Sequence, residues 1–182
     1  RNLEIMWASI HRDKETPFYV GVYYGKQESD NKEDVREEID NLTEEILELQ
    51  STGEILLFMD GNGKVGMIGE EISRNGGALN DMIDECELVL LNAKDNCIGK
   101  ITRQNRKKKD EFSAIDFVLA SQEAYPTITK MFIDEEGEFR IRSKNDSDHN
   151  TIIVDLKMNN LPKEKIVRVS EWNINAPPEK WE

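Results

Sequence analysis

The sequence predicts an α/β domain in which sheets and helices pack as layers. Two short apolar runs have the length and composition of buried strands, and two other segments carry apolar residues at the three- and four-residue spacing of amphipathic helices. The second half of the chain adds several more segments of strand type. With 182 residues, of which 37% are hydrophobic, the chain has the size of one such domain with a substantial core.

The first third of the chain is predicted to contain two strands, a helix and a buried strand. Residues 3–10 and 18–24 are rich in β-branched and aromatic side chains and lie on either side of a polar turn. A helix follows, with Asp30 or Asn31 as its N-cap, because apolar residues then recur on one helical face. These residues are Val35, Ile39, Leu42, Ile46 and Leu49. Residues 54–59 (EILLFM) form a mostly apolar run typical of a buried strand.

The rest of the chain is predicted to add a second helix at residues 77–87, a buried strand at residues 88–92, and further strands. The further strands are residues 114–120, 127–133, 138–142 and 151–156. Residues 101–112 (ITRQNRKKKDEF) are strongly basic and are predicted to form a loop. The proline-containing tail shows little periodicity, so we expect a domain at residues 1–157 and a linker at residues 158–182.

The charge and the cysteines limit the class of protein. A net charge of −13 disfavours a module that binds nucleic acid through a general positive field, but it allows an enzyme with a locally basic face. Cys86 and Cys97 lack a metal-type spacing, and Cys86 falls on a helical apolar stripe, which favours reduced thiols in an intracellular protein. No apolar run approaches the length of a transmembrane helix, so no membrane partner is expected.

Two polar residues directly follow the predicted buried strand at residues 54–59. Asp60 and Asn62 lie in a glycine-rich turn (DGNGKVG), where the backbone can approach a ligand closely. In the structural alternative, both side chains bind local backbone groups, as in an Asx turn. Taken alone, this stretch favours the structural alternative.

An acid inside an apolar strand and a histidine before the last strand form a second candidate group. Asp116 interrupts the run AIDFVLA, where an ionised carboxylate is costly unless it is paired, although it could also cap a neighbouring loop. His149 is its candidate partner, because a carboxylate on one ring nitrogen makes the imidazole a stronger base. Asp148 directly precedes His149, so the two side chains are expected on opposite faces of the chain.

The basic segment and Tyr24 are weaker candidates. Residues 99–109 concentrate cations in an otherwise acidic chain, which favours contact with a phosphate backbone over a merely solvated loop. The cations are Lys100, Arg103, Arg106, Lys107, Lys108 and Lys109. Tyr24 ends the strand at residues 18–24, a position where tyrosine more often belongs to the core than to a catalytic site.

The order of these motifs resembles the endonuclease/exonuclease/phosphatase superfamily, and most closely the apurinic/apyrimidinic-like endonuclease domain of non-LTR retrotransposons. The matching stretches are TGEILLFMDGNGKVG, LVLLNAKDN, KITRQNRKKKDEFSAIDFVL and SDHNTIIVDL, and the similarity extends over roughly residues 3–156. The resemblance implies a layered α/β sandwich of the deoxyribonuclease/apurinic endonuclease type, here without its N-terminal strands.

The resemblance also implies roles for the candidate residues. The residues at the attacked phosphate would be Tyr24, Asp60, Asn62, Asp116 and His149. His149 would serve as general base or phosphate stabiliser, Asp116 would orient it, and Asp60 would align the attacking water. Asp148 would lie near the divalent metal ion. The residues along the DNA would be Thr102, Arg103, Arg106, Lys107 and Ser113.

The function that the resemblance implies is nicking of DNA with Mg²⁺ or Mn²⁺ as cofactor. The protein would be nuclear, and its tail would lead to a reverse transcriptase. Two alternatives stay open, namely a phosphatase acting on a small phosphorylated molecule and a non-catalytic interaction module that has kept the fold.

Two features depart from the family pattern. The family's early segment carries an asparagine and a glutamate that is its main metal carboxylate, and no equivalent precedes Arg1. Weak metal binding and doubtful activity are therefore expected of the chain by itself. Gly61 also replaces the family's phenylalanine between Asp60 and Asn62, with an expected loss of about 3 kcal/mol in packing.

Overall fold

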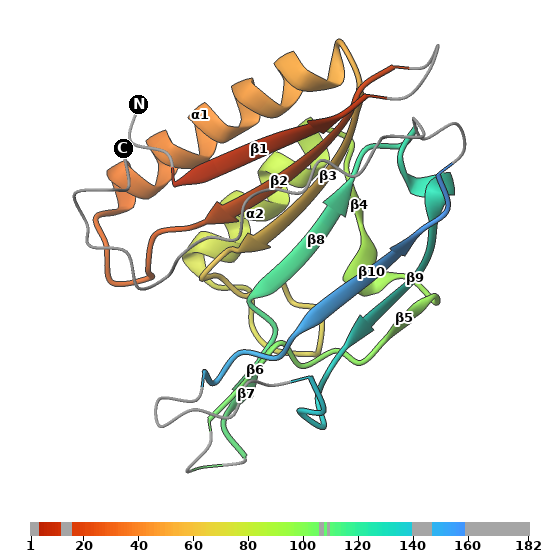
Figure 1. The fold of residues 1–182 in the computed structure, drawn as a ribbon. Coiled ribbons are helices and arrows are strands. Elements are labelled where there is room, and N and C mark those ends of the chain that lie inside the picture. The colour runs from red at the N-terminus through yellow and green to blue at the C-terminus, as the bar shows by residue number, and fades with distance from the viewer. Residues whose placement is uncertain (1–3, 12–15, 106–107, 109, 140–146, 159–182) are drawn as a thin grey trace, which may run out of the picture.

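The fold consists of two packed sheets, with both helices on the outer face of the larger sheet (Figure 1). The computed structural model describes residues 4–11, 16–105, 108, 110–139 and 147–158. The larger sheet has the strand order β1-β2-β3-β8-β4, the smaller one β10-β9-β5, and β6 pairs with β7 in a separate ribbon. The elements are β1 (Ile5–Ile10), β2 (Phe18–Tyr24), α1 (Lys32–Gln50), β3 (Glu54–Asp60), α2 (Arg74–Glu85), β4 (Val89–Leu90), β5 (Cys97–Ile98), β6 (Arg103–Gln104), β7 (Phe112–Ser113), β8 (Asp116–Ala120), β9 (Ile128–Ile133) and β10 (Ile152–Leu156).

Both helices are capped at their first turn and bury one apolar face. Asn31 is the N-cap of α1, and its side chain accepts a hydrogen bond from the Glu33 backbone N–H at 2.8 Å. Ser73 caps α2 in the same way, with its hydroxyl accepting from the Gly76 N–H. The apolar faces of both helices join the core cluster on one side of the larger sheet.

Strands β3 and β8 lie in the centre of the larger sheet and are buried on both faces. Leu57 and Phe117 are fully buried on the side of the helices, and Leu56 and Val118 are buried on the side of the smaller sheet. Two covered faces explain the nearly uninterrupted apolar sequences of these strands.

The register of three neighbouring strands places polar residues in one row at the end of the larger sheet. Strand β2 runs parallel to β3 and pairs Tyr24 with Asp60. Strand β8 runs antiparallel to β3 and pairs Asp116 with Asp60. The candidate site therefore rests on the most deeply buried strands of the fold.

The second helix and the strand after it differ from the prediction. Helix α2 begins at Arg74, earlier than predicted, because Ser73 supplies its N-cap. The predicted strand at residues 88–92 is reduced to β4, which is followed by a 3-10 turn at Leu91–Ala93. The cause is the buried Asn92, whose side chain donates to the Asp116 carbonyl at 3.1 Å and accepts from the Val118 N–H at 2.9 Å, both on β8.

Other predicted segments also differ or lie outside the described residues. The strand predicted at residues 138–142 is wrong for Glu138 and Phe139, which lie in a turn where their N–H groups donate to the buried Asp134 carboxylate. Residues 140–142 and 159–182, most of the predicted linker, lie outside the described residues. The basic segment predicted as a loop contributes β6 and part of β7. Neither described helix has the length and apolarity needed to cross a membrane.

Gly61 leaves no packing gap, contrary to the expected loss. A Cβ built at Gly61 would lie 2.7 Å from Leu79 Cδ1 and 3.3 Å from the Phe117 ring. These two side chains already fill the space beside the turn, and a larger residue there would require the end of the Leu79 side chain to move.

We expect the substitution Gly76→Ala to lower the free energy of unfolding by about 1–3 kcal/mol. Its Cβ would overlap the backbone carbonyl of Lys64, which a rotamer change cannot relieve. The matched control is Gly77→Ala on the same helix, where a Cβ meets no atom within 4 Å. That control is expected to stabilise by about 0.5–1 kcal/mol, because alanine is the better helix former. Urea unfolding of the two variants tests this; equal effects would contradict the close approach of α2 to the backbone of Lys64.

Candidate active site

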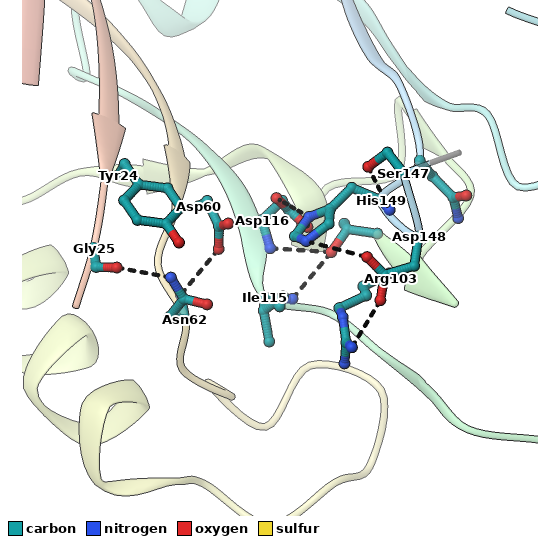
Figure 2. Close-up of polar contacts among 12 residues, drawn as sticks. Tyr24, Gly25, Asp60, Asn62, Arg103, Ile115, Asp116, Ser147, Asp148 and His149 are labelled. Atoms are coloured by element: carbon teal, nitrogen blue, oxygen red, sulfur yellow. Dashed lines mark hydrogen bonds and ion pairs between the residues drawn. The ribbon is translucent and has the colours of Figure 1, made fainter. Parts of the chain in front are cut away.

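A cavity of about 450 Å³ lies where β2 and β3 end and β8 begins (Figure 2). Its lining includes Tyr24, Asp60, Asn62 and His149, and Asp116 is bound to the ring of His149. The structure therefore brings together the four groups, Asp60, Asn62, Asp116 and His149, that the sequence analysis placed in one site. The fold achieves this because the ends of adjacent strands meet at one edge of a sheet.

His149 and Asp116 form a hydrogen-bonded pair. The Nδ1 atom of His149 lies 2.9 Å from Asp116 Oδ1 and 3.1 Å from Oδ2. The pKa of His149 is raised above its ordinary value of 6.5, chiefly because its ring N–H donates to Asp116, and partial burial offsets this only in part. With Nδ1 donating, Nε2 of the neutral ring is the nitrogen available as a proton acceptor.

The backbone at His149 is held beside β6 by an isolated bridge and two neighbouring hydrogen bonds. Arg103 and His149 form an antiparallel bridge, and the Asn150 N–H donates to the Thr102 carbonyl at 2.6 Å. The Gln104 N–H donates to the Asp148 carbonyl at 2.8 Å. The imidazole is therefore fixed by the ribbon that also carries Arg103.

Asp60 occupies a partly buried position beside a second carboxylate. Its pKa is raised, first by burial and second by repulsion from Asp116, while His149 acts in the opposite direction. The Asn62 N–H donates to Asp60 Oδ1 at 3.2 Å. A cation placed here would favour the ionised form of Asp60 and so lower its pKa.

Asn62 adopts a backbone conformation that is unusual for a residue other than glycine. Its φ is 45°, in the left-handed region, which asparagine tolerates better than most residues. Its side-chain Nδ2 donates to the Gly25 carbonyl at 2.7 Å. That bond fixes which way the amide points, and it leaves the second N–H of Nδ2 to donate elsewhere.

Tyr24 is not a core residue, so the more common interpretation of a tyrosine at this position is wrong here. Its side chain is about half exposed and lines the cavity. The Gln27 amide, which the sequence analysis did not single out, donates to the Tyr24 hydroxyl oxygen at 3.0 Å. Because that oxygen already accepts a bond from the protein, the phenolic proton is available to a ligand.

Asp148 departs from its predicted position in two ways. The expectation that it and His149 diverge is wrong: both line the cavity, with Asp148 Oδ1 3.8 Å from His149 Nε2. The other oxygen, Oδ2, forms an ion pair with Arg103 at 2.7 Å. In this geometry Asp148 neutralises Arg103, and its role as a metal ligand stays a prediction.

The residues predicted to lie along DNA divide into three groups. Thr102 is fully buried, and its hydroxyl accepts from the N–H groups of Ile115 and Asp116 at 3.0 Å each, so its predicted contact with DNA is wrong and it instead holds the start of β8. Arg103 and Ser113 line the cavity, and the buried Ser113 hydroxyl has no hydrogen-bond partner in the described part of the chain. Arg106 and Lys107 lie outside the described residues.

Asp60 is the carboxylate best placed for a divalent metal ion. One ligand atom each of Asp60, Asp116 and His149 lie within 4.8 Å of one another. Both Asp116 oxygens, however, are within 3.1 Å of the His149 ring, so Asp116 acts on the imidazole. Mg²⁺ is commonly held by one or two carboxylates together with substrate phosphate, and Asp60, which lines the cavity, fits that pattern.

Solved structures with a similar fold include nucleases and a phosphatase. The endonuclease domain of TRAS1, a telomere-specific non-LTR retrotransposon, is 18% identical with a TM-score of 0.62 over 85% of this chain and 64% of that one. The 3′ phosphatase NExo from Neisseria, in a structure bound to product DNA hairpin, is 13% identical with a TM-score of 0.60 over 85% of this chain and 71% of that one. A Bacteroides thetaiotaomicron protein of the endonuclease/exonuclease/phosphatase family is 17% identical with a TM-score of 0.57 over 82% and 52% of the two chains.

The sequence comparisons add no match, since neither a protein-family model nor a curated sequence is similar to this chain. The chain spans 64% of the length of the TRAS1 domain. The described sheets and helices have the fold of the endonuclease/exonuclease/phosphatase structures, the layered α/β sandwich that the sequence predicted.

Proposed function

We propose that this chain is part of a metal-dependent endonuclease domain that nicks DNA. The observation that carries the proposal is the hydrogen-bonded Asp116–His149 pair, which meets Asp60 and Asn62 at one cavity. A base, a carboxylate for a cation and neutral donors are the groups that hydrolysis of a phosphodiester requires. The similarity to the TRAS1 domain supports a retrotransposon-type protein.

Each residue has a task in the proposed reaction. Asp116 holds His149 so that Nε2 of the neutral ring takes a proton from the attacking water, or so that Nε2–H of the protonated ring donates to the attacked phosphate. Asn62 and Tyr24 donate to phosphoryl oxygens through the protons that their own protein contacts leave free. Asp60 would align the attacking water. Asp148 would lie near a divalent metal ion that neutralises charge on the phosphate, and Asp60 is a further carboxylate that could hold that ion.

The basic side of the cavity is proposed to follow the DNA backbone. Arg103 and Ser113 face the cavity, and Lys108 extends from the same β6–β7 segment. Arg106 and Lys107 are proposed to continue this contact. When DNA binds, the Arg103 guanidinium would leave the Asp148 carboxylate and bind a phosphate instead, because both partners are anions. A nuclear location and a reverse transcriptase after residues 158–182 belong to the same proposal.

The test is nicking of supercoiled plasmid by the full-length protein that contains this chain. We expect conversion to open circles with Mg²⁺ or Mn²⁺ and none in EDTA, because the phosphate charge must be neutralised. The full-length protein is used because this chain spans 64% of the TRAS1 domain. Absence of nicking with either metal would reject the proposal, and calorimetry that then detects no Mg²⁺ binding would favour the non-catalytic module.

The same assay separates an endonuclease from a phosphatase acting on small molecules. An endonuclease should be inhibited by unrelated duplex DNA and unaffected by millimolar inositol phosphate. The opposite pattern, with release of inorganic phosphate, would identify the phosphatase.

A further inference from the structure

A buried glutamate lies on the inner face of α1, outside the cavity. Glu38 is 7% exposed, and its carboxylate accepts a hydrogen bond from the Tyr23 hydroxyl at 2.7 Å. Its second oxygen forms an ion pair with the Lys26 ammonium at 2.8 Å. A buried charge is costly unless it is paired, so the Glu38 carboxylate depends on both the Tyr23 hydroxyl and the Lys26 ammonium.

The two partners of Glu38 lie on either side of Tyr24 and Gly25. Tyr23 is the last buried residue of β2, and Lys26 lies in the loop between β2 and α1. Burial, together with the bond to Glu38, raises the pKa of Tyr23, which keeps its hydroxyl protonated and donating. The carboxylate therefore fixes the chain at both ends of the Tyr24–Gly25 pair.

Gly25 is hydrogen-bonded to two residues that line the cavity, Asp60 and Asn62 (Figure 2). Its N–H donates to the Asp60 carbonyl at 2.8 Å, and its carbonyl accepts from Asn62 Nδ2 at 2.7 Å. Gly25 is closely packed here, since a Cβ would lie 3.2 Å from the carbonyl oxygens of Asp60 and Gly61. A displacement of Gly25 would thus rotate the amide of Asn62.

We infer that Glu38 is a positioning residue for the Asn62 amide, acting through Tyr23, Lys26 and Gly25. The inference rests on the proposed function, in which Asn62 donates to the phosphate. Glu38 itself does not line the cavity. It holds the donor in place, so its loss should reduce the rate of the chemical step more than substrate binding.

The experiment compares Glu38→Gln with Glu37→Gln in the full-length protein. Both remove one negative charge from α1, but Glu37 is exposed. In plasmid nicking, Glu38→Gln should lower kcat by about tenfold or more with KM changed by less than about twofold, whereas Glu37→Gln should leave both unchanged. Tyr23→Phe, which removes only the hydroxyl, should give a smaller loss of the same kind. An unchanged kcat in Glu38→Gln would overturn the inference.

An Asn62→Ala background shows whether the effect passes through Asn62. If it does, adding Glu38→Gln to Asn62→Ala should change kcat by less than about twofold. The same tenfold loss in that background would mean that Glu38 only stabilises the fold, which overturns the inference.

A second measurement does not depend on activity. The side-chain NH₂ signal of Asn62, assigned with Asn62→Ala, should shift and exchange faster in Glu38→Gln but not in Glu37→Gln. An unchanged signal overturns the positioning role. If the wild type shows no nicking, the proposed function fails, and this signal still decides whether Glu38 positions Asn62.

Discussion

His149→Ala is expected to lower the rate of plasmid nicking by the full-length protein by about 10²–10⁴-fold, the range typical for loss of a general base. The substitution removes the Nε2 acceptor and leaves Asp116 without its ring partner. The position of the backbone should persist, because the bridge to Arg103 and the Asn150–Thr102 hydrogen bond involve main-chain atoms. The variant should therefore lose catalysis while it keeps the fold.

The chain offers a matched control for that experiment. His11 is the other histidine of the sequence; it is exposed, interacts with the Ser9 hydroxyl at 3.2 Å and does not line the cavity. His11→Ala should retain nicking within about twofold, as is usual for surface substitutions. Equal nicking by His149→Ala and wild type, with matching thermal unfolding, would remove His149 from the mechanism.

The elements that were predicted well have signals within a short stretch of sequence. Strand β2 was predicted at its observed bounds, and β3 nearly so, because aromatic, β-branched or leucine-rich runs there coincide with two-sided burial. The start of α1 was predicted because Asn31 is an N-cap of ordinary type. Local propensity and tertiary packing agree at these positions.

The elements that were missed depend on contacts between distant residues. Strand β4 stops early because Asn92 bonds to the backbone of β8, and nothing near Asn92 in the sequence signals that partner. Glu38 falls on the buried face of α1, and a charged residue there signals a paired carboxylate. The identity of Tyr23 and Lys26 as its partners needed the structure.

The candidate site was predicted from the order of its motifs, and its finer geometry was not. The meeting of Asp60 and Asp116 depends on strand register, which fixes which residues lie opposite each other. The alternation rule of a regular strand misplaced Asp148, because the segment before β10 forms a single bridge with β6. Thr102 is buried because its hydroxyl accepts hydrogen bonds from the backbone N–H groups of Ile115 and Asp116, where β8 begins. These partners are also distant from Thr102 in the sequence.

Asp116→Asn is expected to reduce nicking by about 10²–10⁴-fold at neutral pH, because the carboxylate both orients His149 and strengthens it as a base. It should also change the pH dependence. Asp116 raises the pKa of His149 above 6.5, and the base must be neutral to accept a proton. Wild-type activity should therefore rise as pH increases through this raised pKa, whereas the residual activity of the variant should begin to rise at lower pH.

The direction of the change in the His149 pKa can be measured on the metal-free protein, without an activity assay. Within residues 1–182 the histidines are His11 and His149, and the variants His11→Gln and His149→Gln assign their ring signals in an NMR titration. The pKa of His149 should lie above 6.5 in the wild type and fall in Asp116→Asn. A raised pKa in the folded state also means that the Asp116–His149 pair stabilises the fold fully below about pH 6.5 and loses that contribution as pH rises through the folded pKa. The difference in unfolding free energy between wild type and variant should therefore shrink in that direction. If the pKa of His149 is the same in both proteins, Asp116 does not act on the imidazole, and the proposed general base loses its support.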